Sequence, residues 1–149
     1  MIMENIKFCG KDHEDLFYTL FKKMKSKDCY HGAAAYLLSL DTVLKDHIDR
    51  VFDFKEDIIK PECIYEPWQT GTSKKTTRLL FNLWNGTYKD TERRCSFDYE
   101  DEEEPDEDEA EQERCRTSMY YAPDGIFCCS YAPYFWQAIQ LRYPEYSEP

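Results

Sequence analysis

The stretch Pro67–Gly86, PWQTGTSKKTTRLLFNLWNG, contains the signals that begin, fill and end one helix. Thr72 or Ser73 is a suitable N-cap, because either hydroxyl can accept a hydrogen bond from an otherwise unpaired N–H of the first turn. Gly86 is a suitable residue just past the end, since glycine enters the left-handed conformation without a Cβ clash. Between these ends lies a wide apolar face formed by Leu79, Leu80, Leu83 and Trp84. The pattern predicts a largely buried helix that is central to the core.

Apolar residues at helical spacing predict further helices on both sides of this stretch. These predicted helices span residues 12–24, 32–40, 41–52 and 133–143. Residues 54–68 contain two prolines and are predicted to be a linker with at most one helical turn. The turn signal Pro123-Asp124-Gly125 fits either a short β-hairpin within residues 119–129 or a short helix that begins at Pro123. Over its full length of 149 residues the chain is expected to form a compact, mainly α, single domain of about five helices.

One segment, residues 98–113, carries most of the negative charge. It contains twelve acids and no base, whereas the whole chain has a net charge of −11. Outside this segment 18 acids face 19 bases, so the rest of the domain is nearly neutral. Ala110 is the one apolar side chain in residues 100–113, so this part can bury too little surface to offset the cost of ordering it. The sequence therefore predicts an acidic, disordered insertion within the domain.

Three interpretations of this acidic segment stay open. It can be a solvated insertion, a mimic of a phosphate backbone that occupies a basic groove of a nucleic-acid enzyme, or a cover over basic residues of the same chain. As a partner-binding segment it would present ten carboxylates in close succession: Asp98, Glu100, Asp101, Glu102, Glu103, Glu104, Asp106, Glu107, Asp108 and Glu109. Salt should weaken such binding steeply, because exposed charges are screened within about 8 Å at physiological ionic strength.

Three bases stand near the start of the predicted central helix, where cations oppose the helix dipole. Two explanations are open. These bases interact with carboxylates of this chain or with solvent, or they bind a phosphate or a nucleic-acid backbone. A tryptophan and an amide stand beside them, and these side chains could stack on a nucleobase and recognise it by hydrogen bonding. Such a tryptophan can equally be a buried residue of the core. The candidate anion-binding residues are Trp68, Gln69, Thr70, Ser73, Lys74, Lys75 and Arg78. Three charges are few for a nucleic-acid interface, so direct nucleic-acid binding is the weaker expectation.

Signals for catalysis are absent from the sequence. The chain has no Cys-x-x-Cys, no His-x-x-x-His and no Gly-x-Ser-x-Gly pattern, so no catalytic residue, metal site or cofactor is predicted. The three histidines are far apart in sequence, and a nucleophilic pair such as His31 with Cys29 or Cys63 stays open. His31 precedes a run of alanines and is placed to cap a helix or to hydrogen-bond to the linker 54–68.

The expected compartment is the cytoplasm. The chain opens on polar sequence rather than a signal peptide, and no apolar run approaches the length of a membrane span. Its cysteines are therefore expected to be reduced. Cys95 and Cys115 bracket the acidic segment beside arginines that favour the thiolate, so a redox clasp between them is the alternative.

Several blocks together resemble a family of small uncharacterised proteins, a domain of unknown function, from Firmicutes and their phages and mobile elements. The blocks are Trp68-Gln69-Thr70, Ser73, Arg78, Phe81-Asn82-Leu83, Asn85-Gly86 and Arg142-Tyr143-Pro144-Glu145-Tyr146, with His13, Asp28 and Tyr30. The resemblance covers most of the chain except about residues 88–118. It implies a bacterial or phage context and carries over no catalytic residues. The acidic segment departs from the family's pattern.

Together these features lead to one hypothesis and one alternative. The hypothesis is a non-enzymatic binding protein of phage or mobile-element origin. Its acidic segment would occupy a basic surface of a host protein such as a defence nuclease, as an inhibitor, anti-CRISPR protein or DNA mimic. The alternative is a small enzyme or nucleic-acid-binding module that uses the Trp68-Gln69-Thr70 and Lys74-Lys75-Arg78 face together with His31.

Overall fold

The computed structural model describes residues 5–91 and 118–146, and within these ranges the chain is mainly helical, as predicted. The α-helices are α1 (Lys11–Lys23), α2 (Cys29–Leu40), α3 (Ile48–Val51), α4 (Gly71–Asn85), α6 (Pro123–Ile126) and α7 (Ala132–Arg142). Short 3₁₀ helices connect them: η1 (Leu44–His47), η2 (Pro61–Tyr65), η3 (Met119–Tyr121) and η4 (Pro144–Tyr146). Two strands, β1 (Phe52–Asp53) and β2 (Ile58–Ile59), form an antiparallel hairpin. The acidic segment and the pair Cys95 and Cys115 lie outside the described residues.

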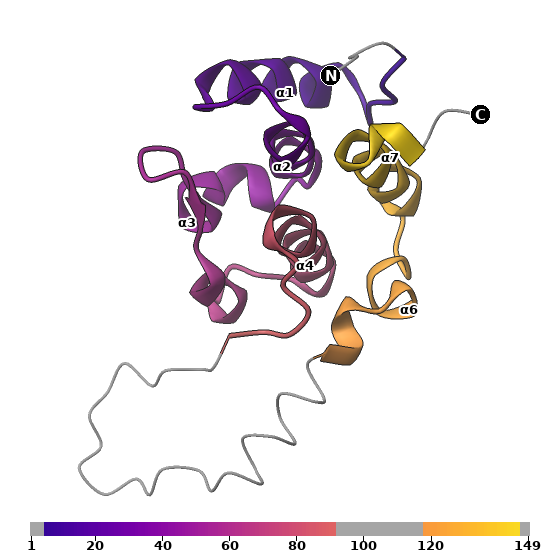
Figure 1. Ribbon diagram of the computed structural model, residues 1–149. Coiled ribbons are helices and arrows are strands. Elements are labelled where there is room, and N and C mark those ends of the chain that lie inside the picture. Colours follow the sequence, from indigo (N-terminus) through magenta and orange to yellow (C-terminus); the bar gives the residue numbers. More distant parts are fainter. Residues whose placement is uncertain (1–4, 92–117, 147–149) are drawn as a thin grey trace, which may run out of the picture.

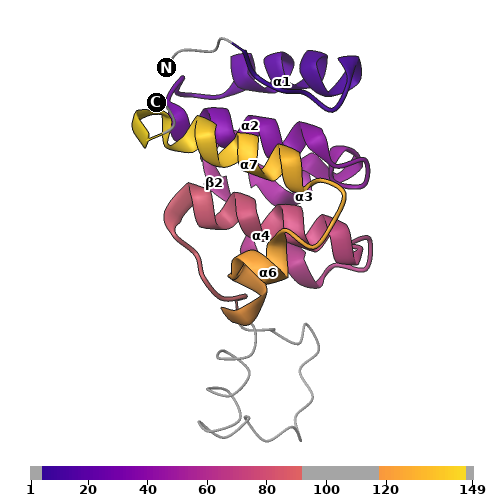
Figure 2. The same cartoon turned by 90° about the vertical axis from the view of Figure 1, so that its right-hand side faces the viewer.

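Helix α2 lies at the centre of the fold, with α1, α4 and α7 packed around it (Figures 1 and 2). Every residue from His31 to Leu40 is buried, because alanines and leucines occur on all sides of this helix. Ala33, Ala34 and Ala35 let neighbouring helices approach closely. The long central helix predicted from the sequence, α4, packs against α2 with its own apolar face.

The ends of α4 differ in one respect from the prediction. The N-cap is Thr70, whereas Thr72 or Ser73 was expected. Ser73 instead occupies the third helical position and completes a capping box, in which each hydroxyl accepts a hydrogen bond from the other residue's backbone N–H. The predicted end is confirmed, since Gly86 adopts a φ of 80° in the left-handed region.

The hairpin was not predicted: β1 lies where the predicted helix 41–52 ends, and β2 lies within the predicted linker 54–68. Phe52 pairs with Ile59 and Asp53 with Ile58. Residues 119–129, where a hairpin was one of two options, instead form η3 and α6, so the short helix beginning at Pro123 is confirmed. The predicted helix 41–52 is broken at His47 (φ −134°, ψ 28°) into η1 and α3. None of the helices in the described ranges has the length and apolar character needed to cross a membrane.

Candidate functional site

The residues that precede α4 are used mainly to build the start of that helix. The side-chain oxygen of Gln69 accepts a hydrogen bond from the Ser73 hydroxyl at 2.5 Å. Its nitrogen donates to the Cys63 carbonyl and to the Thr77 hydroxyl, both at 3.3 Å. With the Thr70 capping box, three of the seven predicted anion-binding residues are thus engaged within the chain. Their polar groups hold the η2–α4 connection together.

Trp68 lies in a separate cluster beside this connection. Its ring stacks on the His47 imidazole with centroids 4.2 Å apart and planes at 3°. Its indole N–H donates to Glu66 Oε1 at 3.0 Å, and Glu66 also accepts from Arg50. The Arg50 guanidinium and the Trp68 N–H hold the pKa of Glu66 below its ordinary value. Trp68 is therefore positioned by intramolecular contacts, with His47 occupying one face of its ring.

Arg78 has a carboxylate of this chain as its counter-charge, one of the two options left open by the sequence. Its guanidinium donates to both oxygens of Asp90, at 3.0 and 2.8 Å, and both side chains are buried. The Tyr121 hydroxyl donates to the same carboxylate at 2.9 Å, and the Tyr120 ring lies 4.4 Å from the guanidinium carbon. Burial and the negative charge of Asp90 raise the pKa of Tyr121 above its ordinary value. This network joins the chain on both sides of residues 92–117.

Two lysines complete the predicted anion-binding set. Lys75 donates to the Cys128 carbonyl at 2.9 Å, and Lys74 is half-buried in the first turn of α4. The structure therefore places Gln69, Thr70 and Ser73 together at the helix start and Arg78 one turn further on, paired with Asp90.

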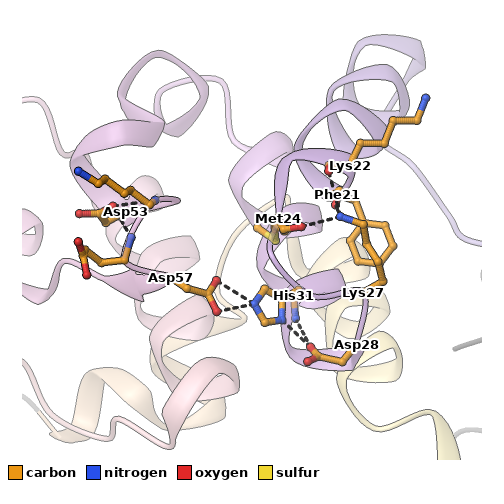
Figure 3. A network of polar contacts seen from close by, with 10 residues as sticks. Phe21, Lys22, Met24, Lys27, Asp28, His31, Asp53 and Asp57 are labelled. Atoms are coloured by element: carbon orange, nitrogen blue, oxygen red, sulfur yellow. Dashed lines mark hydrogen bonds and ion pairs between the residues drawn. The ribbon is translucent and has the colours of Figure 1, made fainter.

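A second polar cluster lies at the start of α2, and Figure 3 shows its geometry. His31 Nδ1 is 2.6 Å from Asp28 Oδ1, and His31 Nε2 is 2.9 Å from both oxygens of Asp57. The imidazole is buried, whereas the Asp28 side chain is 48% exposed. Burial raises the pKa of Asp28, but hydrogen bonds from the His31 side chain and backbone outweigh it and hold that pKa below its ordinary value.

Local structure positions each member of this cluster. Asp28 is the N-cap of α2, and its side chain accepts a hydrogen bond from the His31 backbone N–H at 3.0 Å. Asp57 closes the turn between β1 and β2 with a φ of 59°, in the left-handed region that Asp tolerates better than most residues. The expected hydrogen bond from His31 to the linker is confirmed. Asp57 could not be predicted as the partner, because it is 26 positions away in the chain.

Aromatic and basic side chains surround the His31 cluster. Trp84 of α4 contacts the imidazole edge to face, with centroids 4.9 Å apart. Arg142 of α7 lies 3.7 Å from the Tyr30 ring and donates to the Leu83 carbonyl at 2.8 Å. The structure thus brings Arg142 of α7 against Tyr30, two residues after Asp28, and all three residues carry the family resemblance.

Nucleophilic chemistry finds little support in this arrangement. Both ring nitrogens of His31 face carboxylates rather than a thiol. Cys63 is buried, and burial together with the nearby Glu66 raises the pKa of its thiol to about 12. Across residues 5–91 and 118–146, no group of three or more His, Cys, Asp or Glu side chains is arranged to hold a metal ion.

Comparison with known proteins gives one match, to a family model. The model described as "Family of unknown function (DUF6075)" matches residues 3–149. No curated protein and no solved structure matches the chain.

Proposed function

The chain belongs to DUF6075, a family of unknown function, and we propose that it is a non-enzymatic binding protein whose acidic segment, residues 98–113, engages a basic surface of a host protein. The composition of that segment is the first support. It concentrates twelve acids without a base, while the remainder of the chain is nearly neutral. Because the charge is confined to one segment, a basic partner would be attracted to that segment rather than to the whole surface.

The observation that carries the proposal is the anchoring of both flanks of this segment on α4. Asp90 precedes the segment and Tyr121 follows it, and Asp90 binds both Arg78 and Tyr121. The Thr91 carbonyl also accepts a hydrogen bond from the Tyr65 hydroxyl at 2.6 Å. In Figures 1 and 2 the described chain stops after residue 91 and resumes at 118 at the same end of the molecule. The folded part thus holds the chain in place on both sides of the acidic segment.

Exposed apolar side chains lie close to both anchors in the sequence. Tyr88, two residues before Asp90, is 61% exposed, and Met119, two residues before Tyr121, is 69% exposed. Aromatic and methionine side chains are enriched at protein interfaces. They can add apolar contact to an association that is steered by charge.

The partner that fits this chemistry is a protein with a basic groove, such as a nuclease that normally holds a phosphate backbone. A run of carboxylates resembles that backbone in charge density, so the protein would act as an inhibitor by mimicry of DNA. A phage or mobile-element origin is consistent with such a role. The alternative, an enzyme or nucleic-acid-binding module on the Trp68-Gln69-Thr70 face, is less favoured because Gln69, Thr70 and Arg78 are committed to intramolecular bonds.

The test compares capture of proteins from a bacterial lysate by three forms of the chain. The first is the natural chain. The second carries Asp→Asn and Glu→Gln at all twelve acids of 98–113, with Asp90 unchanged so that Arg78 stays paired. The third, K74S/K75S, removes the two bases of the alternative face and leaves the segment intact.

We expect the natural chain and K74S/K75S to capture the same protein, and the neutralised form to lose it. Raising NaCl to 1 M should release the captured protein, because the Debye length falls to about 3 Å. A short DNA duplex should compete for it if the segment mimics DNA. Equal capture by the neutralised form would contradict the proposal, and loss of capture by K74S/K75S alone would support the alternative face.

A further inference from the structure

His31 carries a hydrogen-bond arrangement that depends on one proton. Its two ring nitrogens face two different carboxylates, Asp28 at 2.6 Å and Asp57 at 2.9 Å (Figure 3). An imidazolium donates from both nitrogens, whereas a neutral imidazole has one N–H and one lone pair. In the neutral ring a lone pair would therefore point at a carboxylate oxygen, and one of the two contacts would become repulsive. Both contacts hold together only while the ring is protonated.

The two contacts are unequal, so the structure indicates which one opens. Asp28 is fixed independently, because its carboxylate also caps α2 by accepting from the His31 backbone N–H. Among the described residues, Asp57 has the His31 ring as its one hydrogen-bond partner, and its backbone sits in the left-handed region. That conformation is costly for a residue other than glycine unless surrounding contacts hold it. Loss of the proton should therefore release Asp57 and leave Asp28 in place.

Charged groups on the neighbouring elements are engaged elsewhere. Lys27 donates to three carbonyls at the end of α1, Lys23 lies over the Phe54 ring, and Arg142 contacts Tyr30 and the Leu83 carbonyl. No lysine or arginine of residues 5–91 or 118–146 forms an ion pair with Asp28 or Asp57. On the hairpin itself, Asp53 accepts from the backbone N–H groups of Lys55 and Glu56. This second turn contact keeps residues 53–56 closed when Asp57 is released.

We propose that Asp28, His31 and Asp57 form a protonation-dependent latch that fastens the β1–β2 turn to the start of α2. The latch is closed when His31 carries its proton and opens at Asp57 when the proton is lost. Opening frees the Asp57 carboxylate and loosens the adjacent Ile58, whose side chain is already 51% exposed. Since Trp84 contacts the imidazole, the change takes place beside the C-terminal end of α4, six residues beyond Arg78. The latch does not depend on the binding role of the acidic segment.

The experiment is an NMR pH titration of the full chain that follows the His31 ring protons and the backbone amides of Asp57 and Ile58 together. We expect the ring and the two amides to change with a common midpoint. Hydrogen-exchange protection of these amides, corrected for the intrinsic effect of pH, should fall by roughly tenfold to a hundredfold as the ring loses its proton, as expected for the loss of a hydrogen bond to a charged group.

Two matched variants separate the latch from a general effect of pH. D57N keeps a residue that tolerates the left-handed region, and its amide can accept from an N–H or donate to a lone pair, so the turn should stay closed at every pH. D53N changes a carboxylate of the same hairpin that makes no contact with His31, so it should keep the pH transition. Amides that do not change while the natural His31 ring titrates would overturn the proposal, as would a transition that persists in D57N.

Discussion

His13 shows how a single side chain can make stability depend on pH. Its Nδ1 accepts from the Cys9 N–H and its Nε2 donates to the Tyr36 carbonyl, both at 3.0 Å, so the neutral form is the one bound. Burial lowers the pKa of His13 to about 4, against the opposing effect of the Tyr36 carbonyl. Between pH 4 and about 6.5 the unfolded chain therefore binds more protons than the folded one, and stability rises with pH.

We predict that this histidine alone removes about 3 kcal/mol of unfolding free energy as the pH falls from 7 to below 4. Urea denaturation at several pH values measures the effect. The variant H13N provides the comparison, because its side-chain oxygen can still accept from the Cys9 N–H but does not titrate. An equal slope for both proteins between pH 4 and 6.5 would contradict the assignment.

The buried pair of Arg78 and Asp90 leads to a prediction about coupling. Removing the base alone, as in R78M, leaves the Asp90 carboxylate buried with Tyr121 as its remaining side-chain partner. We expect a loss of about 3–5 kcal/mol, the usual cost of an uncompensated buried charge. The double variant R78M/D90L should lose much less than the sum of the single losses, because an apolar pair needs no compensation. Additive losses in a double-mutant cycle, measured by urea denaturation, would show that the two side chains are not coupled.

At the level of the element, the two ends of α4 depend on different chemistry and can be tested separately. T70A removes the hydroxyl of the capping box and should cost about 1 kcal/mol. G86A places a Cβ on a residue with a φ of 80° and should also cost about 1 kcal/mol. G71A serves as the control, because no atom lies within 4 Å of the added Cβ and its φ is not positive. Thermal and urea unfolding should show a loss for the first two and none for the third.

Gly125 in α6 supports a second prediction at the level of the element, based on a steric clash rather than on the backbone φ angle. A Cβ at this position would lie 2.7 Å from the Met119 carbonyl oxygen and 2.9 Å from that of Tyr120. Both are backbone atoms of η3, so they cannot turn away as a side chain could. G125A should therefore cost about 1–3 kcal/mol, the range for overpacking. If its urea midpoint equals that of the natural chain, η3 and α6 do not pack as closely as the structure shows.

Comparison of the helices with the sequence shows which features are local. The apolar face and terminal glycine of α4 are visible in twenty consecutive residues, so the helix could be predicted. Its N-cap was misplaced by two or three positions, because Thr70, Thr72 and Ser73 can all cap a helix. The β1–β2 hairpin could not be predicted, since strands of two residues are too short to show an alternating pattern. The partners of His31 and Arg78 depend on tertiary packing over 26 and 12 positions, which no local signal records.

At the scale of the whole molecule, α4 separates two regions with different chemistry. Arg78, with Asp90 and Tyr121, holds the flanks of the acidic segment at the middle of the helix, while Trp84 contacts the His31 cluster near its C-terminal end. Arg78 and Trp84 are six residues apart on this helix, about 9 Å along its axis, which is about one Debye length at physiological salt and about three at 1 M salt. At 1 M salt, changes of charge in the acidic segment should therefore leave the His31 latch unchanged, whereas at low salt they act on stability through the total charge of the protein.

The concentration of acids in one segment yields a prediction about salt and stability. Twelve acids within residues 98–113 repel one another and account for a net charge of −11 on a chain that is otherwise nearly neutral. Such repulsion destabilises the compact state and is screened by ions, so the melting temperature of the natural chain should rise from 0.01 M to 1 M NaCl. The form with all twelve acids neutralised should melt higher at low salt and respond weakly. A variant that neutralises only Glu102, Glu103, Glu104 and Glu107 should lie between them. Identical salt dependence in all three proteins would mean that the segment does not destabilise the folded domain through its charge. The observed salt effect would then have to arise from the 18 acids and 19 bases of the remaining chain.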